Sequence, residues 1–152
     1  MHERQHDLSF YKAFVRECET QHYEAKTTII AEGSESDRLY LILEGTVSVQ
    51  VEEDNDSNQL MVVAYLSEGE FVGELGFFSA EAIHRSAKIV AKTDCYIASI
   101  AYQKLNSIRD KYPDIVFAIA SQIASRLVQT TRKLRDLTFV DVAGRIAHAL
   151  LD

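Results

Sequence analysis

The sequence has little of what marks several common protein classes. It contains one proline, two cysteines and no tryptophan in 152 residues. The cysteines, Cys18 and Cys95, are far apart and form no C-x-x-C pair. Neither a disulfide framework nor a zinc or iron–sulfur site is therefore indicated. Free cysteines are usually buried, so we expect both to be small core residues.

Long apolar runs and positive charge are also scarce. No run approaches the roughly 18 residues that a membrane span needs, and residues 1–5 have no apolar signal core. We therefore expect a cytoplasmic protein with no membrane partner. The 16 basic residues are outnumbered by 23 acidic ones, which gives a net charge of −7. Because so acidic a surface repels nucleic-acid phosphates, this chain is not expected to bind DNA by itself.

Catalytic constellations are missing as well. A metal-dependent enzyme of the β-roll type needs clustered histidines and a carboxylate. No nucleophile with a nearby base is found either: Ser86 neighbours Arg85, and His84 would point to the opposite face of a strand from Arg85. The sequence thus predicts a binding protein without catalytic or metal-binding residues. The five histidines are scattered, with no H-x-H pair: His2, His6, His22, His84 and His148.

Short extended runs separated by turns fill the first two thirds of the chain. Val47, Val49 and Val51 alternate with polar residues, as in a strand with one buried face. We predict an α+β fold: an antiparallel, jelly-roll-like β-roll flanked by short helices, with a long C-terminal dimerisation helix. The expected strands are 27–31, 38–43, 46–51, 60–66, 86–91 and 95–100, and the expected short helices are 7–18 and 101–109.

One long helix is predicted to start at Pro113, whose fixed φ suits the first turn of a helix. Nothing breaks the helical pattern up to about residue 138. Apolar residues recur at alternating steps of four and three, which is typical of a coiled-coil seam and indicates a parallel homodimer. Residues 139–141 are expected to end this helix, and Asp141 to cap a further one. The predicted seam is Val116, Ala120, Ile123, Leu127, Thr130, Leu134 and Leu137.

Three of the six glycines, Gly69, Gly73 and Gly76, fall within eight positions of one another. Glycine allows the backbone to approach a ligand closely. A short helix beginning near Glu74 would direct its first amides at an anion. Arg85 can bind two phosphate oxygens with its planar fork, and the Ser86 hydroxyl can donate one more hydrogen bond. This stretch predicts a pocket for a small phosphate ester.

Glu74 narrows the choice of ligand. A carboxylate beside a phosphate is repulsive unless it binds another part of the ligand, and a ribose 2′-hydroxyl fits that role. A 3′,5′-cyclic nucleotide offers both groups in one rigid ring. The triphosphate loop G-x-x-x-x-G-K-[ST] and the dinucleotide loop G-x-G-x-x-G are both absent from the sequence.

The stretch Phe71-Val72-Gly73-Glu74-Leu75-Gly76 with Arg85-Ser86-Ala87 resembles the phosphate-binding cassette of the cyclic AMP receptor (catabolite activator) family. Segments 43–47, 91–95 and 141–147 resemble the same family in the same order. The resemblance covers roughly residues 20–152 and implies cAMP as the ligand. It assigns the cyclic phosphate-ribose to Gly73, Glu74, Leu75, Arg85 and Ser86, the base to Thr130 and Thr131, and a position near the phosphate to Arg126.

The same resemblance implies three domains. They are a cyclic-nucleotide-binding roll (1–112), a dimerisation helix (113–138), and a hinge with the first helix of a truncated winged helix-turn-helix domain (139–152). The implied function is cAMP sensing and homodimerisation for a bacterial transcription regulator. The resemblance implies that DNA and RNA polymerase are bound only by the full-length protein. Thr130 could also be a polar residue that fixes the register of the seam, and Arg126 a solvated helix charge. Two other functions stay open: a cyclic-nucleotide module with another output, or a ligand-independent dimeric scaffold.

Overall fold

The computed structural model describes residues 11–35, 37–52, 59–82 and 87–151, apart from the side chains at 82, 139–141 and 151. The chain divides into two compact units, residues 1–116 and 117–152. All of the described strands belong to the first unit, and the second unit is helical throughout its described length.

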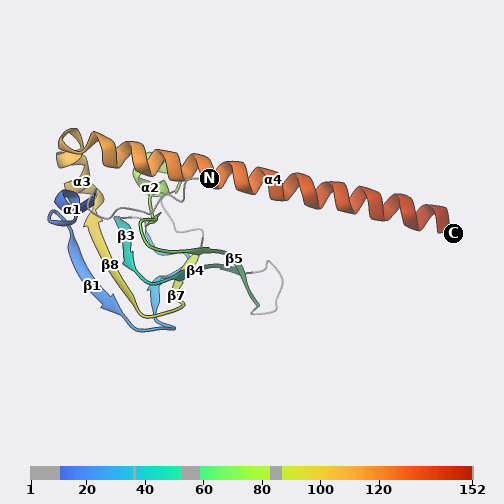
Figure 1. Cartoon of the computed structure of the whole chain (residues 1–152), viewed down its shortest axis with the longest axis horizontal. Helices are drawn as coiled ribbons and strands as arrows, with labels where there is room; N and C mark the ends of the chain where they lie inside the picture. Colours follow the sequence, from blue (N-terminus) through green and yellow to red (C-terminus); the bar gives the residue numbers. More distant parts are fainter. Residues whose placement is uncertain (1–10, 36, 53–58, 83–86, 152) are drawn as a thin grey trace, which may run out of the picture. The chain divides into compact units, whose positions relative to one another are not determined.

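Eight described strands form two antiparallel sheets of four strands each (Figure 1). Every pairing within the sheets is antiparallel, as the sequence predicts for a roll. In spatial order, one sheet contains β1 (Glu19–Tyr23), β8 (Cys95–Ala101), β3 (Arg38–Glu44) and β6 (Phe71–Val72). The other contains β2 (Thr28–Ile30), β7 (Lys88–Ala91), β4 (Val47–Glu52) and β5 (Leu60–Leu66).

The core lies between the two sheets and draws on both of them. Alternation along β4 turns Val47 inward, and Ile42 of β3 and Ile97 of β8 meet it in the same buried cluster. Leu39 and Leu41, on the opposite face of β3, are also buried. β3 is therefore covered on both faces. The buried cluster consists of Ile30, Ile42, Val47, Leu66, Val72, Ile89, Ala91, Cys95 and Ile97.

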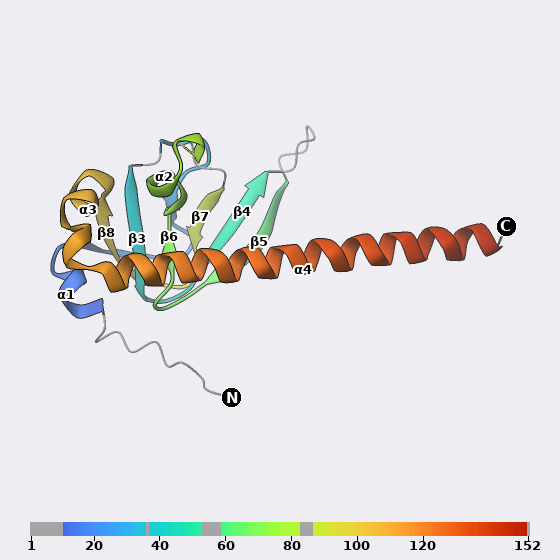
Figure 2. The same cartoon turned by 90° about the horizontal axis from the view of Figure 1, so that it is seen from above.

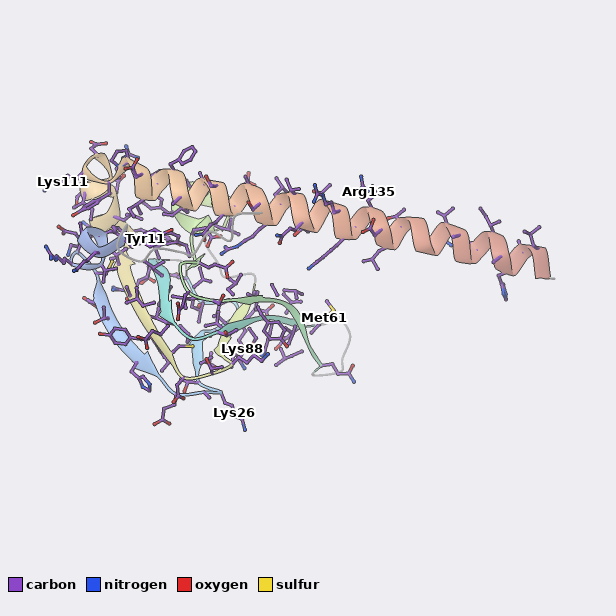
Figure 3. All side chains as sticks on the ribbon, viewed as in Figure 1. Tyr11, Lys26, Met61, Lys88, Lys111 and Arg135 are labelled. Atoms are coloured by element: carbon purple, nitrogen blue, oxygen red, sulfur yellow. The ribbon has the colours of Figure 1, made fainter. Side chains whose placement is uncertain are left out.

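Short helices flank the roll, so the predicted fold class is confirmed. In α1 (Lys12–Val15), Phe14 packs edge-on against Phe71 at 6.5 Å and against Tyr112 at 5.7 Å between ring centroids. Tyr11, labelled in Figure 3, packs on Phe71 at 5.6 Å. This aromatic cluster holds α1 against the end of the roll. The other short helices are α2 (Leu75–Phe78), η2 (Ala80–Ala82), α3 (Tyr102–Ile108) and η3 (Arg109–Lys111).

The two cysteines are both free thiols, but they differ in burial. Cys95 is 1% exposed and belongs to the core between the sheets, as predicted. Cys18 is only partly buried, although its burial still raises the pKa of its thiol to about 11. A thiol with so high a pKa stays neutral at physiological pH, and the thiolate is the reactive form, so Cys18 lacks the character of a reactive cysteine.

The long helix α4 (Pro113–Leu151) begins at the predicted proline and then continues without interruption (Figure 2). The predicted break at 139–141 is wrong. None of Phe139, Val140 and Asp141 lacks a backbone N–H or requires a positive φ, so nothing there stops the intrahelical ladder. In the view of Figure 3, side chains project both above and below α4, among them the labelled Arg135. None of the helices described here combines the length and the apolar character needed to span a membrane.

Candidate ligand-binding site

The turn that leads into the predicted site is held by hydrogen bonds to β3 and within itself. The Gly69 N–H donates to the Ile42 carbonyl at 2.9 Å, and the Ile42 N–H donates to the Glu70 carbonyl at 3.0 Å. The carboxylate of Glu70 closes the turn by accepting from the Ser67 N–H at 2.6 Å. The chain therefore enters the site at a fixed position.

Strand β6 then anchors the loop to the core. Phe71 pairs with Leu41 and Val72 with Tyr40 across the antiparallel ladder to β3. Phe71 is fully buried beneath Tyr11, and Val72 belongs to the core between the sheets. The backbone that follows β6 thus starts from a rigid platform.

Gly73 is the point where the chain turns away from β6. Its φ is +77°, a left-handed conformation that glycine adopts without the strain a side chain would cause. The hydroxyl of Tyr102, the first residue of α3, donates a hydrogen bond to the Gly73 carbonyl. The Tyr102 ring also packs against Phe77 of α2, with 5.6 Å between ring centroids.

Glu74 follows directly and is 6% exposed, which is unusual for a carboxylate. It is the residue that precedes α2, so the prediction of a short helix starting near Glu74 is confirmed. Its carboxylate does not cap that helix, whereas its backbone carbonyl accepts from the Phe77 N–H at 3.1 Å. An ionised carboxylate only accepts hydrogen bonds, so the Glu74 side chain suits a ligand that offers a hydroxyl.

Leu75 opens α2 and leaves about half of its side chain exposed, as does Phe78 at the end of the same helix. The buried acid and the left-handed glycine therefore lie next to an apolar surface. Among the described residues, no group of three or more histidines, cysteines and acids could hold a metal ion.

The other predicted ligand residues are not brought into this geometry. Arg85 and Ser86 lie outside the described residues. Arg126, Thr130 and Thr131 lie on α4 in the second unit, so their part in a common site with Gly73 stays a prediction.

On α4, the side chains of Thr131 and Arg126 each form a hydrogen bond within the helix. The Thr131 hydroxyl donates to the Leu127 carbonyl at 2.8 Å, and the Arg126 guanidinium donates to Gln122 at 3.4 Å. A hydroxyl that has given its proton to a carbonyl still has lone pairs to accept from a second donor. Thr131 is therefore prepared to receive a hydrogen bond.

Tyr102 is the contact that reasoning from the sequence missed. It lies 29 positions from Gly73, and no local pattern links the two residues. The only sequence signal was its place at the predicted junction between the last strand and the following helix.

Comparison with known proteins decides the family. The model of the cyclic nucleotide-binding domain matches residues 20–112. The chain belongs to this family. The match begins at the second residue of β1 and ends just before Pro113, so it contains the described strands apart from Glu19, together with the loop of Gly73 and Glu74.

Relatives of the cyclic nucleotide-binding domain include whole transcription regulators. The chain is 41% identical over 137 residues to the cAMP-activated global transcriptional regulator Vfr of Pseudomonas aeruginosa, covering 89% of this chain and 63% of that protein. It is 40% identical over 139 residues to the cAMP-activated regulator CRP of Salmonella typhimurium, covering 91% and 65% respectively. The chain thus spans less than two thirds of the length of these regulators, and none of them is named as an enzyme.

Solved structures agree on the fold of the cyclic nucleotide-binding domain. The c-di-GMP responsive global regulator CLP of Xanthomonas campestris matches with a TM-score of 0.79 and 33% identity, over 96% of this chain and 72% of that one. The catabolite activator protein of Thermus thermophilus matches with a TM-score of 0.72 at 22% identity, over 86% of this chain and 60% of that one. Both support the antiparallel sheets, the short helices and the long C-terminal helix.

Proposed function

We propose that this chain is the cAMP-sensing and dimerisation part of a cytoplasmic bacterial transcription regulator, and that it binds its ligand without chemical conversion. The observation that carries the proposal is the buried carboxylate of Glu74 beside the left-handed Gly73, inside the span that matches the cyclic nucleotide-binding family. The named relatives, cAMP-activated regulators at 40–41% identity, support the same assignment.

In the proposed complex, Glu74 accepts from the ribose 2′-hydroxyl, and Gly73 and Leu75 lie against the sugar and phosphate. Arg85 and Ser86 bind the phosphate oxygens. In this arrangement Glu74 accepts a hydrogen bond from the ribose, and Arg85 and Ser86 donate hydrogen bonds to the phosphate. The Glu74 carboxylate and the phosphate, both negative, therefore do not contact each other. The ribose and the cyclic phosphate of the ligand would thereby both be fixed.

The base is assigned to α4. Thr131 donates its own proton to Leu127, so its oxygen suits an incoming donor such as the 6-amino group of adenine. Guanine has a carbonyl oxygen at this position and offers no such proton. Thr130 and Thr131 are therefore proposed to favour cAMP over cGMP, with Arg126 near the phosphate.

Calorimetric titration of the purified chain tests the ligand. We expect cAMP to bind at one site per chain with micromolar or tighter affinity, and cGMP to bind more weakly. Cyclic di-GMP belongs in the same series, because a structural neighbour at 33% identity is named as responsive to it. If only cyclic di-GMP binds, it replaces cAMP as the proposed ligand. If none of the three nucleotides binds, a ligand-independent scaffold becomes the better account.

The second half of the proposal is a parallel homodimer through residues 113–138. In the single chain, Leu127, Leu134 and Leu137 expose 64%, 60% and 67% of their surface, as expected for a seam that a second copy would cover. Only the full-length protein would bind DNA and RNA polymerase. In that protein, the ligand would shift the population of dimer arrangements.

Replacing Leu134 by glutamate is expected to convert the dimer to a monomer at micromolar concentration, because two like charges would face each other across an apolar seam. The matched control is Gln129→Glu, which adds the same charge at an exposed position of α4 outside the predicted seam. Size-exclusion chromatography with light scattering measures both masses. A wild-type chain that is already monomeric, with and without cAMP, would contradict the proposed interface.

A further inference from the structure

Tyr102 occupies a junction at which three parts of the first unit meet. Its backbone N–H donates to the Asp37 carbonyl at 2.8 Å, which fixes the start of α3 beside the beginning of β3. Its ring packs on Phe77 of α2, and its hydroxyl donates to the carbonyl of Gly73. Backbone, ring and hydroxyl of a single residue are thus each held by a different segment.

The hydroxyl contact has a direct consequence for Glu74. The peptide group is planar and the chain has no cis peptide among its described residues, so a carbonyl and the N–H that follows it point in opposite directions. Holding the Gly73 carbonyl on Tyr102 therefore aims the Glu74 N–H away from the Tyr102 hydroxyl. It also fixes the plane from which the Glu74 side chain departs.

Gly73 is where such control has most effect. At φ +77° the residue has no side chain to restrict its rotation, and glycine samples both signs of φ readily. The hydrogen bond from Tyr102 opposes rotation of the peptide between Gly73 and Glu74. The core anchors Phe71 and Val72 upstream, and the Tyr102 hydroxyl contacts the carbonyl of the Gly73–Glu74 peptide itself.

We propose that Tyr102 is a positioning residue for the nucleotide site: its hydroxyl sets the Gly73–Glu74 peptide so that Glu74 meets the ribose hydroxyl. The inference rests on the proposed function, because it assigns Glu74 to the ribose. Tyr102 itself does not touch the ligand in this scheme.

The first test needs no ligand. Tyr102→Phe removes the hydroxyl and keeps the ring on Phe77. We expect hydrogen exchange of the amides at residues 74–79 to accelerate about threefold to tenfold, the range for loss of one hydrogen bond. The matched control is Tyr96→Phe, which removes a hydroxyl that donates to Thr20 at 2.9 Å on the sheet. Equal exchange in wild type and Tyr102→Phe would overturn the inference.

The second test measures affinity for cAMP and for 2′-deoxy-cAMP, which lacks the hydroxyl assigned to Glu74. Wild type and Tyr96→Phe should prefer cAMP, and Tyr102→Phe should narrow that preference by about threefold or more. A role in overall stability alone would lower the thermal midpoint and leave the ratio of the two affinities unchanged.

The outcomes separate the two proposals. An unchanged ratio in Tyr102→Phe, with a wild type that still prefers cAMP, overturns the positioning role and leaves the proposed function standing. A wild type that binds neither nucleotide overturns the proposed function, and with it the ligand role given to Tyr102.

Discussion

Replacing Arg85 by alanine is expected to lower cAMP affinity by about 100-fold or more, equivalent to about 2.7 kcal/mol. The reason is chemical: a guanidinium binds two phosphate oxygens through a planar fork, and its loss leaves the anion without its counter-charge. Arg85→Lys keeps the charge but loses the fork, so its affinity should fall between those of the wild type and the alanine variant.

The control for Arg85→Ala is Arg109→Ala, which removes the same charge from an exposed residue of η3. Calorimetric titration gives the affinities, and circular dichroism reports whether both variants remain folded. If Arg85→Ala binds cAMP within about threefold of the wild type, the phosphate is not held by Arg85 and the proposed site assignment fails.

Most of the fold could be predicted from the sequence because its signals are local. Strand β5 has the predicted bounds, Leu60–Leu66, and α4 starts at Pro113 as predicted. The other predicted strands differ from the structure by a few residues at their ends, where turn residues extend or shorten the ladder.

Strand β1 was missed for a physical reason. Its sequence Glu-Thr-Gln-His-Tyr has no apolar alternation, and four of its five residues are exposed. It is held as a strand by its antiparallel ladder to β8, which comes more than 70 residues later in the chain. A pairing over that distance leaves no periodic pattern in the strand itself.

The candidate site was predictable only in its chemistry. The sequence indicated a glycine turn at Gly73 followed by an acid, Glu74. The structure confirms the positive φ of Gly73 and adds that Glu74 is buried. The contact of Tyr102 with Gly73 depends on how α3 lies after β8, and thus on the tertiary fold. The helix end predicted at 139–141 was wrong because Asp141 is a residue type that can cap a helix but does not have to, and α4 continues through it.

Gly45→Ala is expected to destabilise the roll by about 3 kcal/mol or more, because it combines backbone strain with a clash. Gly45 has φ +93°, and a Cβ there would lie 2.3 Å from the Asp94 carbonyl oxygen and 2.9 Å from the Cys95 sulfur. The neighbouring turns cannot easily separate, since the Lys92 N–H donates to the Thr46 carbonyl at 2.9 Å. The thermal midpoint should fall by about 6 to 12 °C.

Gly33→Ala isolates the two causes. Gly33 has a similar φ of +77°, but a Cβ there would meet nothing within 4 Å. Only the backbone strain remains, and the expected loss is about 1 to 2 kcal/mol. Thermal unfolding of both variants, without ligand and at one protein concentration, measures the difference, because binding and association would otherwise shift the midpoint. Equal losses would show that the turn at Gly45 yields to a side chain, so that the clash with residues 94 and 95 adds nothing to the backbone strain.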